Sequence, residues 1–361
     1  MKSEGESLFF QGKLKQAQEV LRSEAETAGR SCYLLGIILR EGFGAVKADE
    51  DRAEAYFRKG KELGDPLCAA ALAPAASGDE SWDILNRWFP RVLTAAAAGD
   101  AAAMDEAGLF YISGGLMLNF EEGMKWLAKA SLFEYWKGFL DLGKAYEEGR
   151  AVPADPDRAF LCYEKAAAFG IPEGQYRVGE ALIGRTDEED VKKGLALLEK
   201  AYAGGSAEAA LLLGAFYGSE ESGMTDEKKS YCWLEKAAEM DSAEAWAELA
   251  LCRENGLGCE ADLQEAEKCY LRAAELGSEE SRFALGLLYL EEKQDEKAFA
   301  VLKKAGENGH PRALYVTGMM YLSGKGTERN RAEGIACLEE AASLGNAESA
   351  AELEKLRAEE M

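Results

Sequence analysis

The sequence predicts an all-α protein in which antiparallel helix pairs stack as an α-solenoid, and three observations support this. Glycine recurs at intervals of 35 or 36 residues along most of the chain, with one interval of 32. The composition is rich in alanine, leucine and glutamate, with only seven prolines in 361 residues, which is typical of helical chains. Residues 243–277 read as two helices joined by a turn, and most of the chain repeats this unit.

Within this unit, the first helix is expected at 243–254 and the second at 262–277, with a turn at 255–258. Glycine ends the second helix because it adopts a left-handed conformation without steric cost. These glycines are Gly29, Gly64, Gly99, Gly170, Gly205, Gly277, Gly309 and Gly345, and Glu134 and Asp241 take the two remaining places. The next residue often has a side-chain oxygen that can cap the following helix, as at Asp65, Asp100, Ser206, Ser278 and Asn346.

A second glycine column lies inside the first helix of the units. Glycine in mid-helix costs about 1 kcal/mol relative to alanine, so a whole column indicates that two helices approach closely there. Its members are Gly36, Gly108, Gly143, Gly179, Gly214, Gly286 and Gly318. Three of the eight cysteines fall in an apolar column of the second helix, which indicates buried thiols.

The repeat predicts a single solenoid over residues 1–361. Residues 1–29 form a partial first unit, residues 30–345 form nine helix-pair units, and residues 346–361 form a polar capping helix. Two units are atypical. The unit at 66–99 lacks the inner glycine motif, and the unit at 279–310 has only 32 residues and no Gly-x-Gly turn.

The columns resemble the Sel-like repeat family, a relative of the tetratricopeptide repeats. The first-helix motif occurs as Ala210, Leu213, Gly214 and Tyr217, and the second-helix motif follows at 233–238. The resemblance recurs over nearly the whole chain. It implies a right-handed superhelix with the first helices on its concave side, and a role as an adaptor that holds protein complexes together. Some secreted members carry regular cysteine pairs and have been discussed as penicillin-binding, but this chain lacks that cysteine pattern.

The net charge of −24 argues against nucleic acid and against anionic membrane surfaces as partners. It favours a basic or mixed-charge protein or peptide that also offers apolar anchors. The sequence has no visible signal peptide and no apolar run of 18 residues, so membrane insertion is not expected. We expect a cytoplasmic protein, unless a leader has been removed.

The chain offers little for catalysis, and we predict that it is not an enzyme. The one histidine, His310, precedes Pro311 at a helix start, where a capping or exposed role is expected. No CxxC motif occurs, so we expect neither a metal site nor a cofactor. The Gly-x-Gly turns at 42–44, 256–258 and 324–326 follow helices, whereas a phosphate loop follows a strand.

Binding residues are expected on the concave face, at the fifth and ninth positions of the first helices. Large side chains at such positions either anchor a partner or only fill contacts between units. The candidates are Tyr33, Ile37, Asp105, Lys144, Tyr176, Glu180, Phe283, Tyr315 and Met319. Trp82, Trp88 and Trp136 cluster around the irregular early units, where they either fill the core or form a groove for a partner.

These observations predict a non-enzymatic protein–protein interaction scaffold that holds a protein or peptide segment on its concave face. Two alternatives stay open. A secreted, cysteine-rich hydrolase of the penicillin-binding kind would have paired rather than free thiols. An RNA-binding helical repeat would need a basic inner face, which the composition disfavours.

Overall fold

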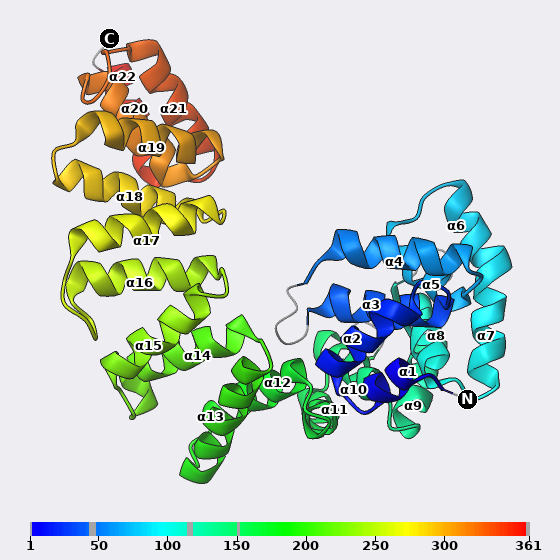
Figure 1. The fold of residues 1–361 in the computed structure, drawn as a ribbon. Coiled ribbons are helices and arrows are strands. Elements are labelled where there is room, and N and C mark those ends of the chain that lie inside the picture. The colour runs from blue at the N-terminus through cyan, green and yellow to red at the C-terminus, as the bar shows by residue number, and fades with distance from the viewer. Residues whose placement is uncertain (1, 43–47, 114–117, 150–151, 359–361) are drawn as a thin grey trace. The chain divides into compact units, whose positions relative to one another are not determined.

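The computed structural model describes residues 2–42, 48–113, 118–149 and 152–358, and all regular structure in this part of the chain is helical (Figure 1). The chain divides into two compact units, Met1–Ala209 and Ala210–Met361. Each unit is described by itself below. That the whole chain forms one continuous solenoid remains a prediction.

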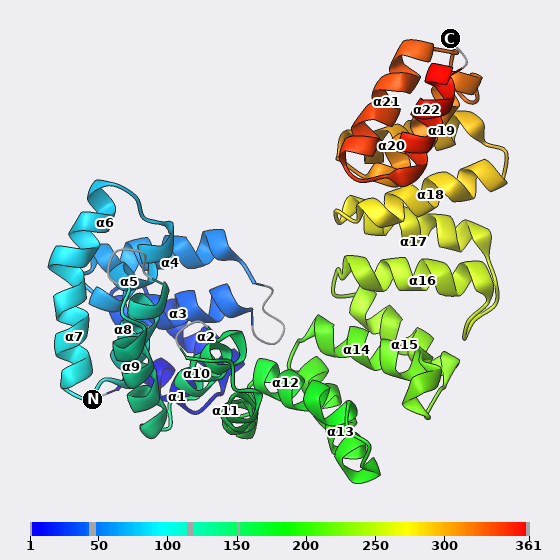
Figure 2. The same ribbon diagram turned by 180° about the vertical axis from the view of Figure 1, so that it is seen from behind.

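Unit 1 is built from helix pairs that follow one another along the chain. Figure 2, from the opposite side, brings α8 and α9 to the front of this unit. The helices are α1 Glu4–Phe10, α2 Leu14–Glu24, α3 Gly29–Glu41, α4 Glu50–Glu62, α5 Pro66–Ala71, α6 Asp79–Asp83, α7 Phe89–Ala97, α8 Ala101–Ser113, α9 Phe120–Leu132, α10 Trp136–Glu148, α11 Pro156–Ala168, α12 Pro172–Ile183 and α13 Glu188–Ala203.

Unit 2 continues the same alternation of first and second helices. The predicted pair at 243–277 is confirmed, since it forms α16 and α17. The helices are α14 Ala207–Gly218, which begins just before the unit boundary, α15 Glu227–Ala238, α16 Ala243–Asn255, α17 Leu263–Glu275, α18 Glu279–Glu291, α19 Asp295–Glu307, α20 Pro311–Ser323, α21 Arg331–Ser343 and α22 Ala347–Ala358.

The predicted helix stops are confirmed at all positions but one. The glycines from Gly64 to Gly345 in that column have positive φ, and Glu134 and Asp241 adopt φ of 55° and 62° in the places without glycine. The prediction is wrong at Gly29, because α2 already ends at Glu24 and Gly29 is the first residue of α3. The caps are also confirmed: Asp65 Oδ1, for example, accepts hydrogen bonds from the amides of Leu67 and Cys68 at 2.9 and 3.0 Å.

The inner glycines lie where the two helices of a pair touch. A Cβ at Gly143 would lie 2.7 Å from the Tyr163 ring, and one at Gly179 would lie 2.8 Å from Leu198 Cγ. At Gly36 and Gly286 it would overlap side chains of the second helix in the same way. Close helix packing, as predicted, is therefore the reason for this column.

The two atypical units differ in kind. In 66–99, the first helix is cut to the six residues of α5, and a π-helical segment at Ile84–Trp88 precedes α7. In 279–310, α18 and α19 form a regular pair, and Lys293 with φ of 60° makes the short turn between them. Only the first of these units departs from the helix-pair geometry.

The Gly-x-Gly turns tie one unit to the unit before it. Gly256, Gly258, Gly324 and Gly326 all have positive φ, which confirms two of the predicted turns, while the turn at 42–44 lies partly outside the described residues. The second glycine of each turn also lies against backbone at the start of the preceding second helix. A Cβ at Gly258 would overlap the carbonyl oxygen of Glu227.

This arrangement predicts unequal effects for the two glycines of one turn. Gly256→Ala should cost about 1–2 kcal/mol, because its φ of 74° is unfavourable but its Cβ would meet only ordinary contacts. Gly258→Ala should cost about 1–3 kcal/mol more, because it also overlaps backbone. Urea denaturation of both variants measures the difference. Equal losses would contradict the proposed backbone contact.

Candidate functional site

In unit 1, the N-terminal helix α1 packs against the start of α10. The Trp136 indole is completely buried, and its Nε1 donates a hydrogen bond of 2.8 Å to the carbonyl oxygen of Phe9, 127 residues earlier. The ring of Phe9 lies 5.1 Å from that of Trp136 and 6.4 Å from that of Tyr135. This contact closes α1 onto the start of α10.

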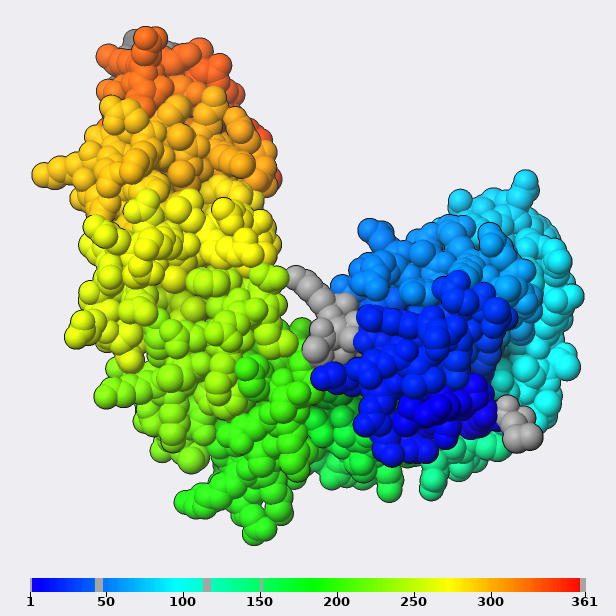
Figure 3. All heavy atoms as spheres, in the orientation of Figure 1, coloured from blue at the N-terminus to red at the C-terminus, as the bar shows by residue number. Residues whose placement is uncertain are grey.

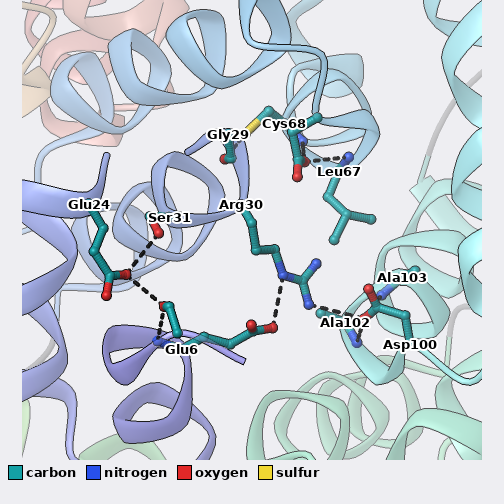
Figure 4. A network of polar contacts seen from close by, with 12 residues as sticks. Glu6, Glu24, Gly29, Arg30, Ser31, Leu67, Cys68, Asp100, Ala102 and Ala103 are labelled. Atoms are coloured by element: carbon teal, nitrogen blue, oxygen red, sulfur yellow. Dashed lines mark hydrogen bonds and ion pairs between the residues drawn. The ribbon is translucent and has the colours of Figure 1, made fainter. Parts of the chain in front are cut away.

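A second closing contact is made by Arg30, at the start of α3. Its guanidinium lies between Glu6 of α1, at 3.3 Å, and Asp100, the N-cap of α8, at 3.0 Å (Figure 4). Glu24 of α2 accepts hydrogen bonds from Ser3 and Ser31 beside it. On the face shown in Figure 3, residues of α1–α4 form an unbroken blue surface.

A cluster of buried charges lies between α8 and α10. Lys137 Nζ contacts Asp105 Oδ2 at 3.3 Å and, more closely, Asp141 Oδ2. Beside them, Tyr33 donates a hydrogen bond of 2.7 Å to Glu106 Oε1. The cluster thus sets three carboxyl groups against one ammonium group.

Burial is the largest influence on the pKa values of this cluster, and the neighbouring charges add to it or oppose it. Burial raises the pKa of Asp105 well above its usual value; Lys137 opposes the rise and Asp141 adds to it. Burial also raises the pKa of Glu106. Burial alone would lower the pKa of Lys137, but Asp105 and Asp141 outweigh it, so the pKa is raised and the ammonium group stays charged. Since all four groups are buried, we assign the cluster to the closure of unit 1.

Asp105→Asn tests the raised pKa through the pH dependence of stability. Folded Asp105 holds its proton more tightly than the unfolded chain, whose aspartates titrate near about 3.9. As pH rises from the unfolded pKa to the higher folded pKa, the ionisation of Asp105 progressively lowers the stability of the protein. The full loss is present above the folded pKa. We expect the variant to gain stability relative to the native protein between pH 4 and pH 8, as measured by urea denaturation. The exposed Asp157→Asn is the control, and a gain of the same size there would count against this assignment.

The predicted binding residues separate into two groups. Tyr33, Ile37, Asp105 and Phe283 are buried, which corrects the expectation that their side chains face a partner. The first three are covered because unit 1 closes on itself, and Phe283 stacks on the His310 ring, 4.8 Å away. A partner-binding role stays a prediction for Lys144, Tyr176, Tyr315 and Met319, which are half-buried, and for Glu180, which is exposed.

The three tryptophans do not form one groove. Trp88 and Trp136 are buried, which fits their reading as core residues, whereas Trp82 is 65% exposed. Trp88 lines a hollow of about 470 Å³ at the end of α4, together with several arginines and carboxylates. Charges there are largely paired with one another, for example Lys61 with Glu80 at 3.1 Å.

An open groove of about 530 Å³ lies in unit 2, between α14, α15 and α16. Its lining combines apolar and acidic side chains with very small residues. The lining residues are Leu211, Gly214, Ala215, Gly218, Ser219, Glu227, Ser230, Leu234, Glu244, Glu248, Cys252 and Leu257. Leu211 and Ala215 occupy the fifth and ninth positions of a first helix, where a concave binding face was expected.

The acidic residues of this groove were not singled out from the sequence. Glu244 and Glu248 lie one turn apart on α16, so they share a helix face, and no lysine or arginine stands at a matching position to pair with them. That spacing is a signal the sequence contains. Glu227 could not be found this way, because only folding brings α15 beside α16.

The remaining chemistry-bearing residues have structural positions. His310 caps α20 as predicted, since Nδ1 accepts a hydrogen bond of 3.1 Å from the Ala313 amide. All eight cysteines are free thiols. Of the three in the apolar column of the second helix, Cys269 is buried as predicted, whereas Cys162 and Cys337 are only half-buried. Cys32, Cys68 and Cys252 are also buried, Cys259 is half-buried and Cys232 is exposed. In the described part of the chain, no group of three or more potential ligands could hold a metal ion.

Comparison with protein families decides what the repeat is. The family model described as Sel1 repeat matches residues 29–65, 101–132, 140–168, 172–206 and 207–242. The chain contains Sel1 repeats in these five segments. A second model, described as plant tetratrico peptide repeats, matches residues 260–358. The Sel1 matches pass over the irregular unit at 66–99, as its geometry would suggest.

Solved structures agree with the predicted all-α solenoid of helix pairs. A Sel1 repeat protein from Oxalobacter formigenes superposes with a TM-score of 0.64 at 27% identity, over 84% of this chain and 89% of that one. A protective antigen of uropathogenic Escherichia coli, c5321, has a TM-score of 0.61 at 22% identity, over 97% of this chain and 78% of that one. The fold class is thereby confirmed.

Two curated Sel1-repeat relatives have names that describe regulation or binding. Chitin synthase regulatory factor 3 of Schizosaccharomyces pombe is 26% identical over 299 residues, which is 77% of this chain and 32% of that protein. DAP3-binding cell death enhancer 1 of Mus musculus is 32% identical over 174 residues, which is 47% of this chain and 34% of that protein. This chain therefore spans about a third of the length of these relatives. Among its described helices, none is long and apolar enough to cross a membrane.

Proposed function

We propose that this Sel1 repeat protein is a non-enzymatic scaffold that binds a protein or peptide segment on the face of its first helices. The groove of unit 2 carries the proposal, because it is an open hollow bordered by α14 and α16, two first helices. The names of the relatives, a regulatory factor of chitin synthase and a DAP3-binding protein, support a role in binding other proteins. Localisation in the cytoplasm remains a prediction.

The two units contribute differently to this proposal. In unit 1, the inner positions at Tyr33, Ile37 and Asp105 are filled by the closing contacts. In unit 2, Leu211, Tyr315 and Met319 are only half-buried. We therefore propose that the partner binds unit 2. Lys144, Tyr176 and Glu180 are the remaining candidates in unit 1.

The test compares proteins retained from a lysate of the source cell by the native chain and by Ala215→Leu. Leucine stands at the equivalent position Leu251 of α16, so the repeat accepts it, and in α14 it would fill the groove. We expect proteins that the native chain retains at both low and moderate salt to be lost by the variant. Retention of the same proteins by both chains would reject the groove as the binding surface.

A further inference from the structure

We propose that the groove of unit 2 binds a lysine or arginine side chain of an extended partner segment, together with an aliphatic side chain next to it. The inference rests on the proposed function and specifies the chemistry of the partner. It follows from the origin of the groove, from its apolar floor and from its uncompensated acidic border.

The groove exists because α14 has unusually small residues on this face. At the ninth position of the first helices, the other units have Ile37, Leu109, Lys144, Glu180, Leu251, Leu287 and Met319, whereas α14 has Ala215. Four residues after the inner glycine, the other units of this column have Arg40, Ile112, Glu147, Ile183, Leu290 and Leu322, whereas α14 has Gly218. The missing side chains leave the hollow open.

The floor of the groove is apolar. Leu234 and Cys252 are buried beneath it, and Leu211 is half-buried at its side. Leu257, from the turn after α16, is 44% exposed and borders the opening. Such a floor fits an aliphatic side chain or the methylene stem of lysine or arginine, both of which gain by leaving water.

The border of the groove is acidic. Glu227, Glu244 and Glu248 are exposed and come from α15 and α16, and no lysine or arginine lines the groove. Glu227 accepts a hydrogen bond of 3.3 Å from the Gly258 amide, and Glu244 accepts one of 3.3 Å from Ser242. Within the described residues, none of the three carboxylates forms an ion pair. Their charge is therefore available to a cationic partner.

Size and charge together restrict the occupant. A volume of about 530 Å³ lies within the range of about 300–1,000 Å³ typical of small-ligand sites, so it holds a few side chains rather than a whole helix. An acidic segment would be repelled by three carboxylates. A purely apolar segment would remove water from these carboxylates without offering them a polar partner, which costs free energy. A basic residue next to an aliphatic one fits both parts of the groove. The basic group can pair with the carboxylates of the border, and the aliphatic side chain can pack on the apolar floor.

The experiment uses the full chain with ¹³C-labelled leucine methyl groups, titrated with the peptide acetyl-Gly-Leu-Arg-Leu-Gly-amide. We expect the methyl signals of Leu211, Leu234 and Leu257 to shift. Peptides with glutamine or glutamate in place of arginine should bind progressively more weakly. The double variant Glu244→Gln/Glu248→Gln should weaken binding of the arginine peptide on the order of 10-fold, the effect of losing two exposed charge pairs.

Matched variants separate charge from fold. Glu239→Gln/Glu260→Gln removes two exposed carboxylates of unit 2 that do not line the groove, and it should leave binding unchanged. Ala215→Leu should abolish the shifts, and Ala215→Met, which copies Met319, serves if the leucine variant unfolds. Equal binding of the arginine and glutamine peptides, or no shift at the three leucines, would overturn the inference.

The lysate comparison distinguishes this failure from failure of the scaffold function. Partners that are lost with Ala215→Leu but retained by Glu244→Gln/Glu248→Gln would uphold the groove as a binding site and reject a basic occupant. Partners that are lost with both would support both proposals. Partners retained by all chains would reject the groove itself.

Discussion

Replacing Lys137 by methionine is expected to lower the free energy of unfolding of unit 1 by about 3–5 kcal/mol. Lys137 is the ammonium group that lies against both Asp105 and Asp141, and all three side chains are buried. Methionine keeps most of the volume but leaves the carboxylates without a counter-charge. Hydrogen exchange of α3, α8 and α10 should speed up, while peptides of α16–α22 serve as an internal reference.

Lys144→Met is the matched control for this prediction. Lys144 lies on the same helix and pairs with Glu41 at 3.6 Å, but 34% of its side chain is exposed. Solvent reaches both partners of this pair, so its contribution should be close to that of a surface ion pair, about 0–1 kcal/mol, and the variant should be nearly neutral. Adding Asp105→Asn and Asp141→Asn to Lys137→Met should recover much of the lost stability. If Lys137→Met costs no more than Lys144→Met, the cluster does not hold unit 1 closed.

Trp136→Ala is expected to cost about 3–5 kcal/mol, the usual loss for truncating a buried tryptophan. The indole is completely buried, and it holds α1 through its ring contact and its hydrogen bond to the Phe9 carbonyl. The loss should be largest in α1 and α2, whose amides should exchange faster with solvent. Differential hydrogen exchange by mass spectrometry measures this directly.

Trp82→Ala is the control, because Trp82 is 65% exposed and should change stability by no more than about 0.5 kcal/mol. Trp136→Phe keeps an aromatic ring but removes the hydrogen-bond donor, so it separates packing from hydrogen bonding. If α1 keeps its protection in Trp136→Ala, the closure of unit 1 does not depend on this contact.

Lys137 and Trp136 also explain why unit 1 exposes so few of its predicted binding residues. A solenoid presents its inner side chains only where successive units leave space between them. In unit 1, α1 and α10 meet through Phe9 and Trp136. The buried charges of this unit, such as those of Lys137 and Asp105, pair with one another. The groove of unit 2 is open because Ala215 and Gly218 are small, and not because its charges are stronger.

The repeat, its helices and most of its turns are decided by local chemistry, so the sequence alone could determine them. Helix stops follow from glycine at positive φ, and Glu134 and Asp241 could be placed there because the period requires it. Caps follow from single side chains such as Asp65, which act on amides two or three residues away. The inner glycines could also be explained from the sequence, because they reflect close packing between the two helices of a single pair.

Only the tertiary structure decided which inner side chains a partner can reach. Whether Tyr33 or Asp105 is exposed depends on how the helices of unit 1 pack against helices far away in the sequence. That packing depends on many small interhelical angles. Asp105 and Lys137 are 32 residues apart, and Phe9 and Trp136 are 127 residues apart, so no local pattern pairs them. The groove likewise required α14, α15 and α16 to be assembled, although its small residues were already visible in the repeat columns.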